Sequence, residues 1–235
     1  MRKSLVILGA REHAKVIFAT LGDALSSEWE VVGFLDDNPQ LAGTKLLGKP
    51  VLGSISQLEE LARSKKIAGA LVGISCNHMP LRKRLFSEIQ KLKLETPTVI
   101  SPTAHVHSTS KIGKGTLVCS GAVVHMFATV GSNAVLYSNS TVEHECVLGD
   151  NVYLGPGVNF CAAVSVGKNT FIGTGANVVC PKVGEDVVVG AGAAVVEDLP
   201  DGAIAVGVPA RVLRTRTPQE REESFILRPN QAVAS

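Results

Sequence analysis

An apolar residue recurs at every sixth position through most of the second half of this chain. The series begins at Val106, continues to Val178 without a polar interruption, and resumes after one deletion at Val183. A small or β-branched residue often stands two positions earlier, and a glycine often follows. The members are Val106, Ile112, Val118, Val124, Val130, Leu136, Val142, Leu148, Leu154, Phe160, Val166, Ile172 and Val178, then Val183, Val189 and Val195.

Strand geometry explains this six-residue period. Residues two apart on a strand point to the same side, and glycine can support a sharp corner. Three such hexads therefore make one triangular coil, and successive coils stack about 4.8 Å apart. We predict a parallel β-helix over residues 101–213.

The first hundred residues have a different periodicity. Short apolar runs at 5–8, 31–35, 68–72 and 98–100 predict strands, and amphipathic patterns at 12–21 and 81–92 predict helices. Ser56 and Glu59 have the spacing of a capping box at the start of a further helix. Alternation of this kind favours parallel strands with helical crossovers, so residues 1–100 are expected to form a Rossmann-like α/β domain.

Composition excludes several classes of protein. A net charge of +2 without a long basic run argues against nucleic-acid binding. The five cysteines are odd in number and lack a C-x-x-C pair, which favours reduced thiols in a cytoplasmic protein. No apolar stretch approaches the ~20 residues of a membrane span, so no membrane insertion is expected. The charged tail, residues 214–235, is expected to be a short helix or disordered.

Four motifs carry a family resemblance. They are Leu8-Gly9-Ala10-x-x-His13, Phe34-Leu35-Asp36-Asp37, Val142-Glu143-His144-Glu145-Cys146 and Val206-Gly207-Val208-Pro209-Ala210. Together with the hexads, they resemble bacterial sugar acyltransferases of the sialic-acid O-acetyltransferase and 4-amino-sugar N-acetyltransferase type. The resemblance implies a left-handed β-helix, a homotrimer, and acetyl-CoA bound in the groove between neighbouring β-helices.

His144 is the candidate general base. The hexad register points Val142 and Cys146 inward and leaves His144 on an outer edge. Histidine suits proton abstraction near neutral pH, as an amine or hydroxyl attacks a thioester. The resemblance implies that Glu145 orients the imidazole and that no covalent acyl-enzyme forms. An exposed corner histidine without a catalytic role remains the alternative.

A cysteine nucleophile and a metal site are the two alternatives for this part of the β-helix. Cys146 could serve as a nucleophile, but its inward position predicts an inert thiol. His107, His125, Glu143 and Cys161 are spaced 18 residues apart and form one outward column that resembles a set of metal ligands. Related zinc-dependent carbonic anhydrases pair histidines five residues apart, and this chain has no such pair, so no metal is expected.

The nucleotide site is expected at the ends of the first strands. Peptide N–H groups between a strand and a helix can hold a phosphate, and acidic residues after the second strand can bind a ribose or base. By resemblance, the contacts are Gly9, Ala10, Arg11, His13, Asp36, Asp37 and Gly73. Arg11 and Glu12 replace the glycines usual in the family, and a plain Asp- and Asn-rich turn is the alternative for Asp36 and Asp37.

The cofactor contacts also come from the resemblance. They are Tyr153, Thr174, Gly190 and Ala191. The position of Ala162 in the hexads, and not the resemblance, suggests a backbone amide near it as the oxyanion donor. The sequence thus predicts an acetyl-CoA-dependent N-acetyltransferase acting on the amino group of a nucleotide-linked, UDP-type amino sugar. The alternatives are O-acetylation of a sialic-acid-like sugar, a zinc-dependent γ-type carbonic anhydrase, and a non-catalytic trimeric scaffold.

Overall fold

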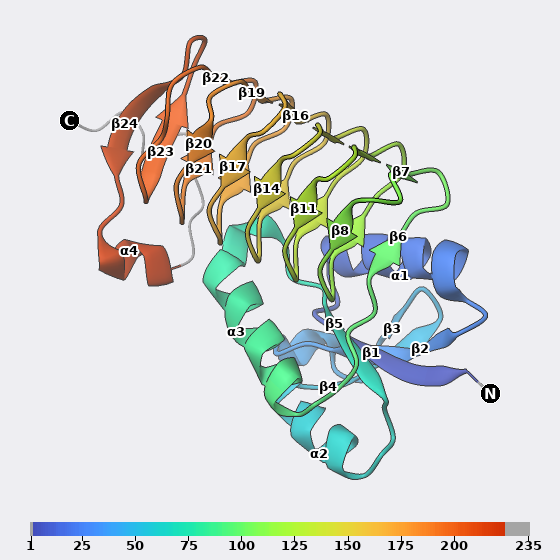
Figure 1. Ribbon diagram of the computed structural model, residues 1–235. Coiled ribbons are helices and arrows are strands. Elements are labelled where there is room, and N and C mark those ends of the chain that lie inside the picture. The colour runs from blue at the N-terminus through green and yellow to red at the C-terminus, as the bar shows by residue number, and fades with distance from the viewer. Residues whose placement is uncertain (1, 224–235) are drawn as a thin grey trace.

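The computed structural model describes residues 2–223, which form an α/β unit packed against a β-helix (Figure 1). The α/β unit has a five-stranded sheet in the order β3-β4-β2-β1-β5. Strands β1 (Lys3–Leu8), β2 (Trp29–Leu35) and β5 (Gly69–Val72) are parallel, as predicted, and β4 (Lys49–Gly53), which was not predicted, pairs parallel with β2. The short β3 (Lys45–Leu46) runs antiparallel to β4, and this hairpin was not predicted.

Helices cover both faces of this sheet. One face packs on α1 (Glu12–Leu25), which in turn contacts the β-helix through residues such as Leu117 and Val135. The opposite face packs on α2 (Leu58–Arg63) and α3 (Met79–Lys91) through Leu58, Leu85 and Ile89. The α/β unit and the β-helix therefore share one continuous apolar core. Short 3₁₀ turns at Pro39–Leu41, Ile55–Gln57 and Cys76–His78 complete the unit.

The predicted capping box at Ser56 is wrong. The 3₁₀ turn before α2 begins at Ile55, whose N–H donates to the Asp37 carboxylate at 2.9 Å. Ser56 consequently lies inside this turn, and its hydroxyl hydrogen-bonds to the Ser54 hydroxyl instead of a helix N–H.

The predicted β-helix is confirmed as three parallel sheets of two-residue strands. The first sheet faces the α/β unit, and the chain then passes through the second and third sheets in every coil. The first contains β6 (Val99–Ile100), β9 (Leu117–Val118), β12 (Val135–Leu136), β15 (Tyr153–Leu154), β18 (Phe171–Ile172), β21 (Val188–Val189), β23 (Ala203–Val206) and the antiparallel β24 (Arg211–Thr215). The second contains β7 (His105–Val106), β10 (Val123–Val124), β13 (Thr141–Val142), β16 (Asn159–Phe160), β19 (Asn177–Val178) and β22 (Ala194–Val195). The third contains β8 (Lys111–Ile112), β11 (Thr129–Val130), β14 (Val147–Leu148), β17 (Ser165–Val166) and β20 (Lys182–Val183).

The sixth-residue positions line a single interior. From Val118 to Val195 they are at most 3 % exposed, and Val106 and Ile112 pack on the open end of the same core. Removing these aliphatic side chains from water stabilises the coil stack by roughly 1.5–3 kcal/mol for each large residue.

The ends of the β-helix differ slightly from the prediction. Strand β6 pairs with β9, so the β-helix already includes Val99 and Ile100. At the other end, β24 extends to Thr215 and is followed by α4 (Pro218–Glu222), which has a complete capping box between Thr217 and Glu220. Residues 224–235 of the predicted tail lie outside the described residues. Between residues 2 and 223, no helix has the length and apolar character needed to cross a bilayer.

Candidate active site

His144 lies on the edge where the second sheet turns into the third, between β13 and β14. The next residue, Glu145, has a left-handed backbone with φ of 60°. This turn brings its carboxylate to 3.3 Å from His144 Nδ1. The side chains are 47 % and 63 % exposed, so His144 Nε2 is open to a ligand while Nδ1 is held by the carboxylate.

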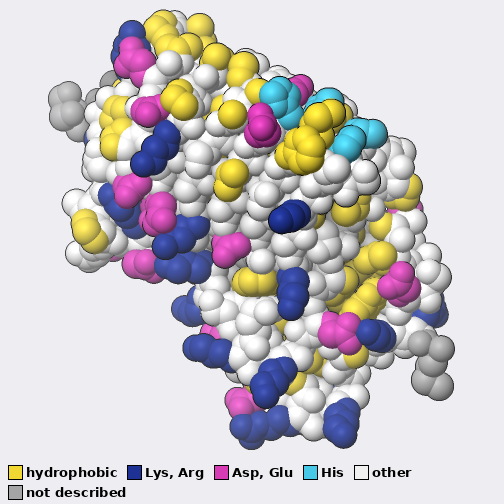
Figure 2. All heavy atoms as spheres, in the orientation of Figure 1, with side chains coloured by type: hydrophobic (Ala, Val, Ile, Leu, Met, Phe, Trp, Pro, Cys, Tyr) yellow, Lys and Arg dark blue, Asp and Glu magenta, His cyan; other side chains and the backbone are white. Residues whose placement is uncertain are grey.

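The neighbouring coils give this edge its surroundings. The coil above places Ala162 next to His144, and the Ala163 N–H donates to the His144 carbonyl at 2.9 Å. Ala162 is exposed, and its own N–H has no hydrogen-bond partner within residues 2–223. The coil below exposes Met126 and Phe127, and Figure 2 shows histidine and hydrophobic side chains side by side here. A free amide donor and an apolar surface therefore flank the histidine.

Cys146 is buried inside the β-helix and donates its S–H to the Cys161 carbonyl. Burial raises the pKa of its thiol, and a buried neutral thiol is a poor nucleophile. The outward column that contains Glu143 does not form a metal site. Within residues 2–223, no three His, Cys, Asp or Glu side chains lie close enough together to bind one metal ion. His107, a member of that column, instead hydrogen-bonds to Thr109.

The predicted nucleotide residues gather where strand order reverses in the α/β sheet. Strands β2 and β5 flank β1, so the turns after β1 and β5 lie at the topological switch point, the place where open α/β sheets commonly bind nucleotides. Gly9 and Gly73 meet there, because a Cβ on Gly9 would lie 2.9 Å from the Gly73 carbonyl oxygen. Gly9 also has φ of 103°, which favours glycine.

Asp36 and Asp37 hold the adjoining turns. One Asp36 oxygen accepts from the Ala10 N–H at 2.8 Å and the other from the Asn38 N–H at 2.9 Å. Asp37 accepts from the Ile55 N–H. Arg11 is exposed at the N-terminus of α1, where no side chain caps the helix. The first peptide N–H groups of α1 thus have no side-chain acceptor.

His13 and Tyr153 differ from the expected contacts, because the structure places both inside the joint between the two units. They are 3 % and 4 % exposed, and their rings lie 5.7 Å apart. His13 Nδ1 is 2.9 Å from the Tyr137 hydroxyl. Burial, together with the Arg82 charge, lowers the pKa of His13 well below its usual value. Neither side chain has the exposed surface that a ligand contact needs in this chain.

Thr174, Gly190 and Ala191 lie on a different edge of the prism from His144. They follow β18 and β21, where the first sheet turns into the second, and Thr174 and Ala191 are exposed. One chain therefore does not bring the expected CoA contacts and the histidine together on the same edge.

Comparison with known proteins identifies the family. Residues 4–89 match the PglD N-terminal domain, and residues 127–162 match the bacterial transferase hexapeptide repeats. The perosamine N-acetyltransferase of Caulobacter crescentus, solved with CoA and GDP-perosamine, is 33 % identical, with a TM-score of 0.81 over 89 % of this chain and 96 % of that one. The chain belongs to this family of hexapeptide-repeat N-acetyltransferases.

Two further members have similar structures. The acetyltransferase domain of PglB from Neisseria gonorrhoeae is 32 % identical, with a TM-score of 0.80 over 90 % of this chain and 100 % of that one. WeeI from Acinetobacter baumannii is 27 % identical, with a TM-score of 0.74 over 88 % of this chain and 98 % of that one. No curated protein matches the chain.

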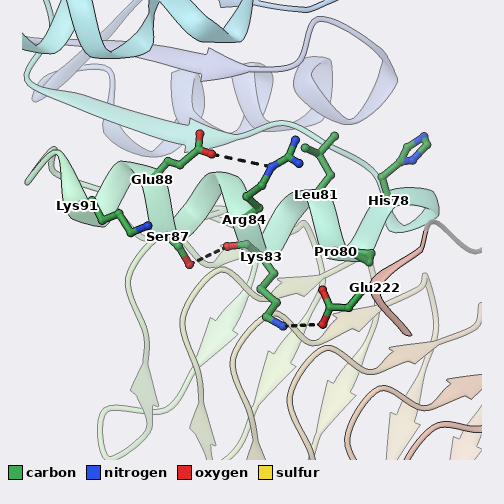
Figure 3. A pocket seen from close by; sticks show the side chains of 9 residues that line it. All are labelled: His78, Pro80, Leu81, Lys83, Arg84, Ser87, Glu88, Lys91 and Glu222. Carbon is green, nitrogen blue, oxygen red and sulfur yellow. Dashed lines mark hydrogen bonds and ion pairs between the residues drawn. The ribbon is translucent and has the colours of Figure 1, made fainter. Parts of the chain in front are cut away.

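A separate cleft of about 560 Å³ runs along the outer face of α3 in this acetyltransferase (Figure 3). Its lining mixes charges, and Lys83 pairs with Glu222 at 3.3 Å across it. None of the predicted site residues lines it, and it includes neither the His144–Glu145 pair nor the turns after β1 and β5. We therefore do not assign the transfer reaction to this cleft.

Sequence reasoning missed the polar centre of the joint between the two units. Arg82 of α3 is fully buried there, against a ladder of Asn133, Asn151 and Asn169 on successive coils. The 81–92 helix was interpreted as an ordinary basic amphipathic helix, which hid the arginine. Asparagines 18 residues apart were a visible signal, since this spacing stacks them on one edge of the β-helix.

Proposed function

We propose that this chain transfers the acetyl group of acetyl-CoA to the amino group of a nucleotide-linked amino sugar. The observation that carries the proposal is the exposed His144–Glu145 pair, in a chain 33 % identical to an enzyme solved with CoA and GDP-perosamine. A UDP-linked sugar is the specific substrate class that we propose. Solved structures of the Caulobacter enzyme also include variants in which one histidine is replaced by asparagine or alanine.

The proposed chemistry uses His144 Nε2 as the general base. The amine nitrogen attacks the thioester carbonyl, forming the C–N bond as His144 takes its proton. Glu145, at 3.3 Å from Nδ1, stabilises the resulting imidazolium. The free Ala162 N–H supports oxyanion stabilisation, and collapse of the adduct breaks the C–S bond and transfers the proton to the departing CoA sulfur.

The active site is proposed to be shared between subunits of a homotrimer. The His144 edge lies between the second and third sheets, whereas the α/β unit packs on the first sheet, on the opposite side of the prism. A nucleotide sugar bound to the α/β unit would therefore reach the His144 edge of a neighbouring copy more readily than its own. The exposed Met126 and Phe127 beside His144 supply an apolar surface that a neighbour would cover.

The binding contacts follow from this arrangement. The N–H groups at the start of α1, with the Arg11 side chain, would hold the diphosphate, and Asp36, Asp37 and Gly73 would shape the nucleoside side. The acetyl-CoA groove between two copies would be lined from two edges of the prism. Ala162 would contribute from the His144 edge, and Thr174, Gly190 and Ala191 from the edge between the first and second sheets.

A ligand screen followed by an assay of CoA release tests the proposed function. Thermal shifts are measured with UDP-, GDP-, dTDP- and CMP-linked sugars, because a ligand at about 100 times its Kd stabilises a protein by about 2.7 kcal/mol. Amino sugars on the stabilising nucleotide are then supplied with acetyl-CoA. CoA release that depends on the amino sugar is expected, and the absence of both shift and release would refute the proposal.

Mixing two inactive variants tests the shared site. His144→Ala lacks the base and Arg11→Glu opposes diphosphate binding, but each retains the residue that the other lacks. Dissociated and reassembled together, they should regain activity above either parent, because some interfaces unite two intact halves. Reassembly without recovery would place the complete site within one chain.

A further inference from the structure

Arg82 is the buried cation at the joint between the α/β unit and the β-helix. It is 1 % exposed, and its guanidinium donates to the carbonyls of Ile74 and Asn133 and to Asn151 Oδ1. Nη1, which donates to the Ile74 carbonyl, also lies 3.4 Å from His13 Nε2. These partners come from both structural units, so Arg82 holds them in one relative position.

None of these hydrogen-bond partners is negatively charged. The groups that act electrostatically on Arg82 within residues 2–223 are Tyr153, Cys76 and Tyr137, and none is a carboxylate. Burial lowers the pKa of Arg82 to about 10, so the side chain remains charged at neutral pH. Buried charges in proteins are normally paired, because an unpaired one loses the hydration free energy without compensation.

The guanidinium of Arg82 lies against the turn that follows β5 and the first turn of α1. Ile74 follows Gly73 in the turn after β5, and His13 lies in the first turn of α1, after β1. Arg82 thus contacts the turns on both sides of the point where strand order reverses. The N-terminus of α1, which no side chain caps, lies at the same switch point.

The hydrogen-bond directions extend the positive polarity from Arg82 to Tyr137, which follows β12 of the first sheet. Arginine only donates, so His13 Nε2 accepts from it and the neutral imidazole carries its proton on Nδ1. That proton is donated to the Tyr137 hydroxyl at 2.9 Å. Both hydrogen bonds, from Arg82 to His13 and from His13 to Tyr137, therefore point their donor hydrogen away from Arg82.

We propose that Arg82 is the fixed positive charge of an anion site between the β1 and β5 turns, and that the diphosphate of the bound nucleotide is its counter-ion. The proposal rests on the proposed function and deepens it. Arg82 acts through the turns and His13, without touching the reacting atoms, and is a positioning residue. It should strengthen binding of the diphosphate without strengthening binding of the uncharged nucleoside.

Calorimetry with inorganic pyrophosphate, UDP and uridine tests this on the intact protein, with GDP and guanosine in parallel. Arg82→Gln should weaken pyrophosphate and the diphosphate about tenfold, the size of one partly buried charge interaction, and leave the nucleoside within twofold. Arg82→Lys retains the charge and should remain within about threefold of wild type for all the ligands. Arg84→Gln is the matched control, since it removes a 69 % exposed arginine from the same helix and should change nothing.

A second variant keeps the test valid if the Arg82 variants fail to fold. Asn151→Asp places a carboxylate where an oxygen already lies 3.3 Å from Arg82 Nε, so it supplies an internal counter-ion. It should weaken pyrophosphate binding about tenfold while Arg82 is still present. Equal weakening of nucleoside and diphosphate, or unchanged pyrophosphate affinity in Asn151→Asp and Arg82→Gln, would overturn the proposal.

Acetyl transfer by the wild-type protein separates the two claims. If the protein binds pyrophosphate through Arg82 but acetylates no amino sugar, the proposed function fails and the anion site stands. If acetyl transfer occurs and Arg82→Gln binds diphosphate as wild type does, the anion site fails and the function stands.

Discussion

Replacing Glu145 by glutamine removes one negative charge from a point 3.3 Å from His144 Nδ1 and keeps an oxygen acceptor of the same shape. At this distance, Coulomb's law gives about 1.3 kcal/mol for two unit charges in water, and more where the proposed second subunit excludes water. That energy acts on the imidazolium, which exists only as the amine is deprotonated. Glu145→Gln should therefore lower kcat about tenfold or more and leave both KM values within about twofold.

The assay follows release of the CoA thiol at saturating acetyl-CoA and amino sugar. His144→Ala removes the base itself and should lower kcat by about 10²- to 10⁴-fold. Glu143→Gln is the matched control on the other side of the histidine and should remain within about threefold of wild type. If Glu145→Gln retains at least half of the wild-type kcat, or if Glu143→Gln is equally impaired, the assigned role of Glu145 is wrong.

Three other predictions follow from the fold and the buried joint. Gly113→Ala should lower the free energy of unfolding by about 3 kcal/mol, because its Cβ would lie 2.5 Å from the Gly131 backbone. Gly157→Ala has open space around its Cβ and should cost only about 1 kcal/mol, from the strain of its left-handed backbone. Urea unfolding of both variants at one protein concentration measures the two losses. His13 has a folded-state pKa below the value of 6.5 in the unfolded chain, so the unfolded state takes up the proton first as pH falls. Stability should fall by up to about 1.4 kcal/mol per unit below pH 6.5, and His13→Gln should lack this slope in urea unfolding between pH 5 and 7. Prior treatment with a chelator should leave acetyl transfer unchanged, and a loss that zinc restores would show that the transfer depends on a metal and contradict the metal-free mechanism.

The β-helix could be predicted in detail because its sequence repeats the physical requirement for every coil. Each inward position, such as Leu136 or Leu154, must be apolar, and the repeat would still be recognisable if a single position departed from the pattern. The α/β strands were also predictable, since buried parallel strands are short apolar runs between turns. The β3–β4 hairpin was missed because its turn is Leu47-Gly48, and leucine with φ of 48° gives no turn signal.

The candidate site was only partly accessible to sequence reasoning. Hexad register placed His144 and Glu145 outward, since alternation along a strand is a local property. Register does not reveal which outward faces become covered, and Tyr153 lies under the α/β unit for that reason. The Arg82 network joins residues from α1, α3 and two coils, and such long-range contacts leave no local pattern around the arginine itself.

The most direct test of the account is the chemical identity of the transferred group. The protein is incubated with acetyl-CoA and the nucleotide-linked amino sugar that stabilises it, and the product is analysed by mass spectrometry before and after hydroxylamine treatment. The account predicts the gain of one acetyl group that hydroxylamine does not remove, because the product is an amide. An acetyl group that hydroxylamine removes would indicate an ester on a sugar hydroxyl and would contradict it.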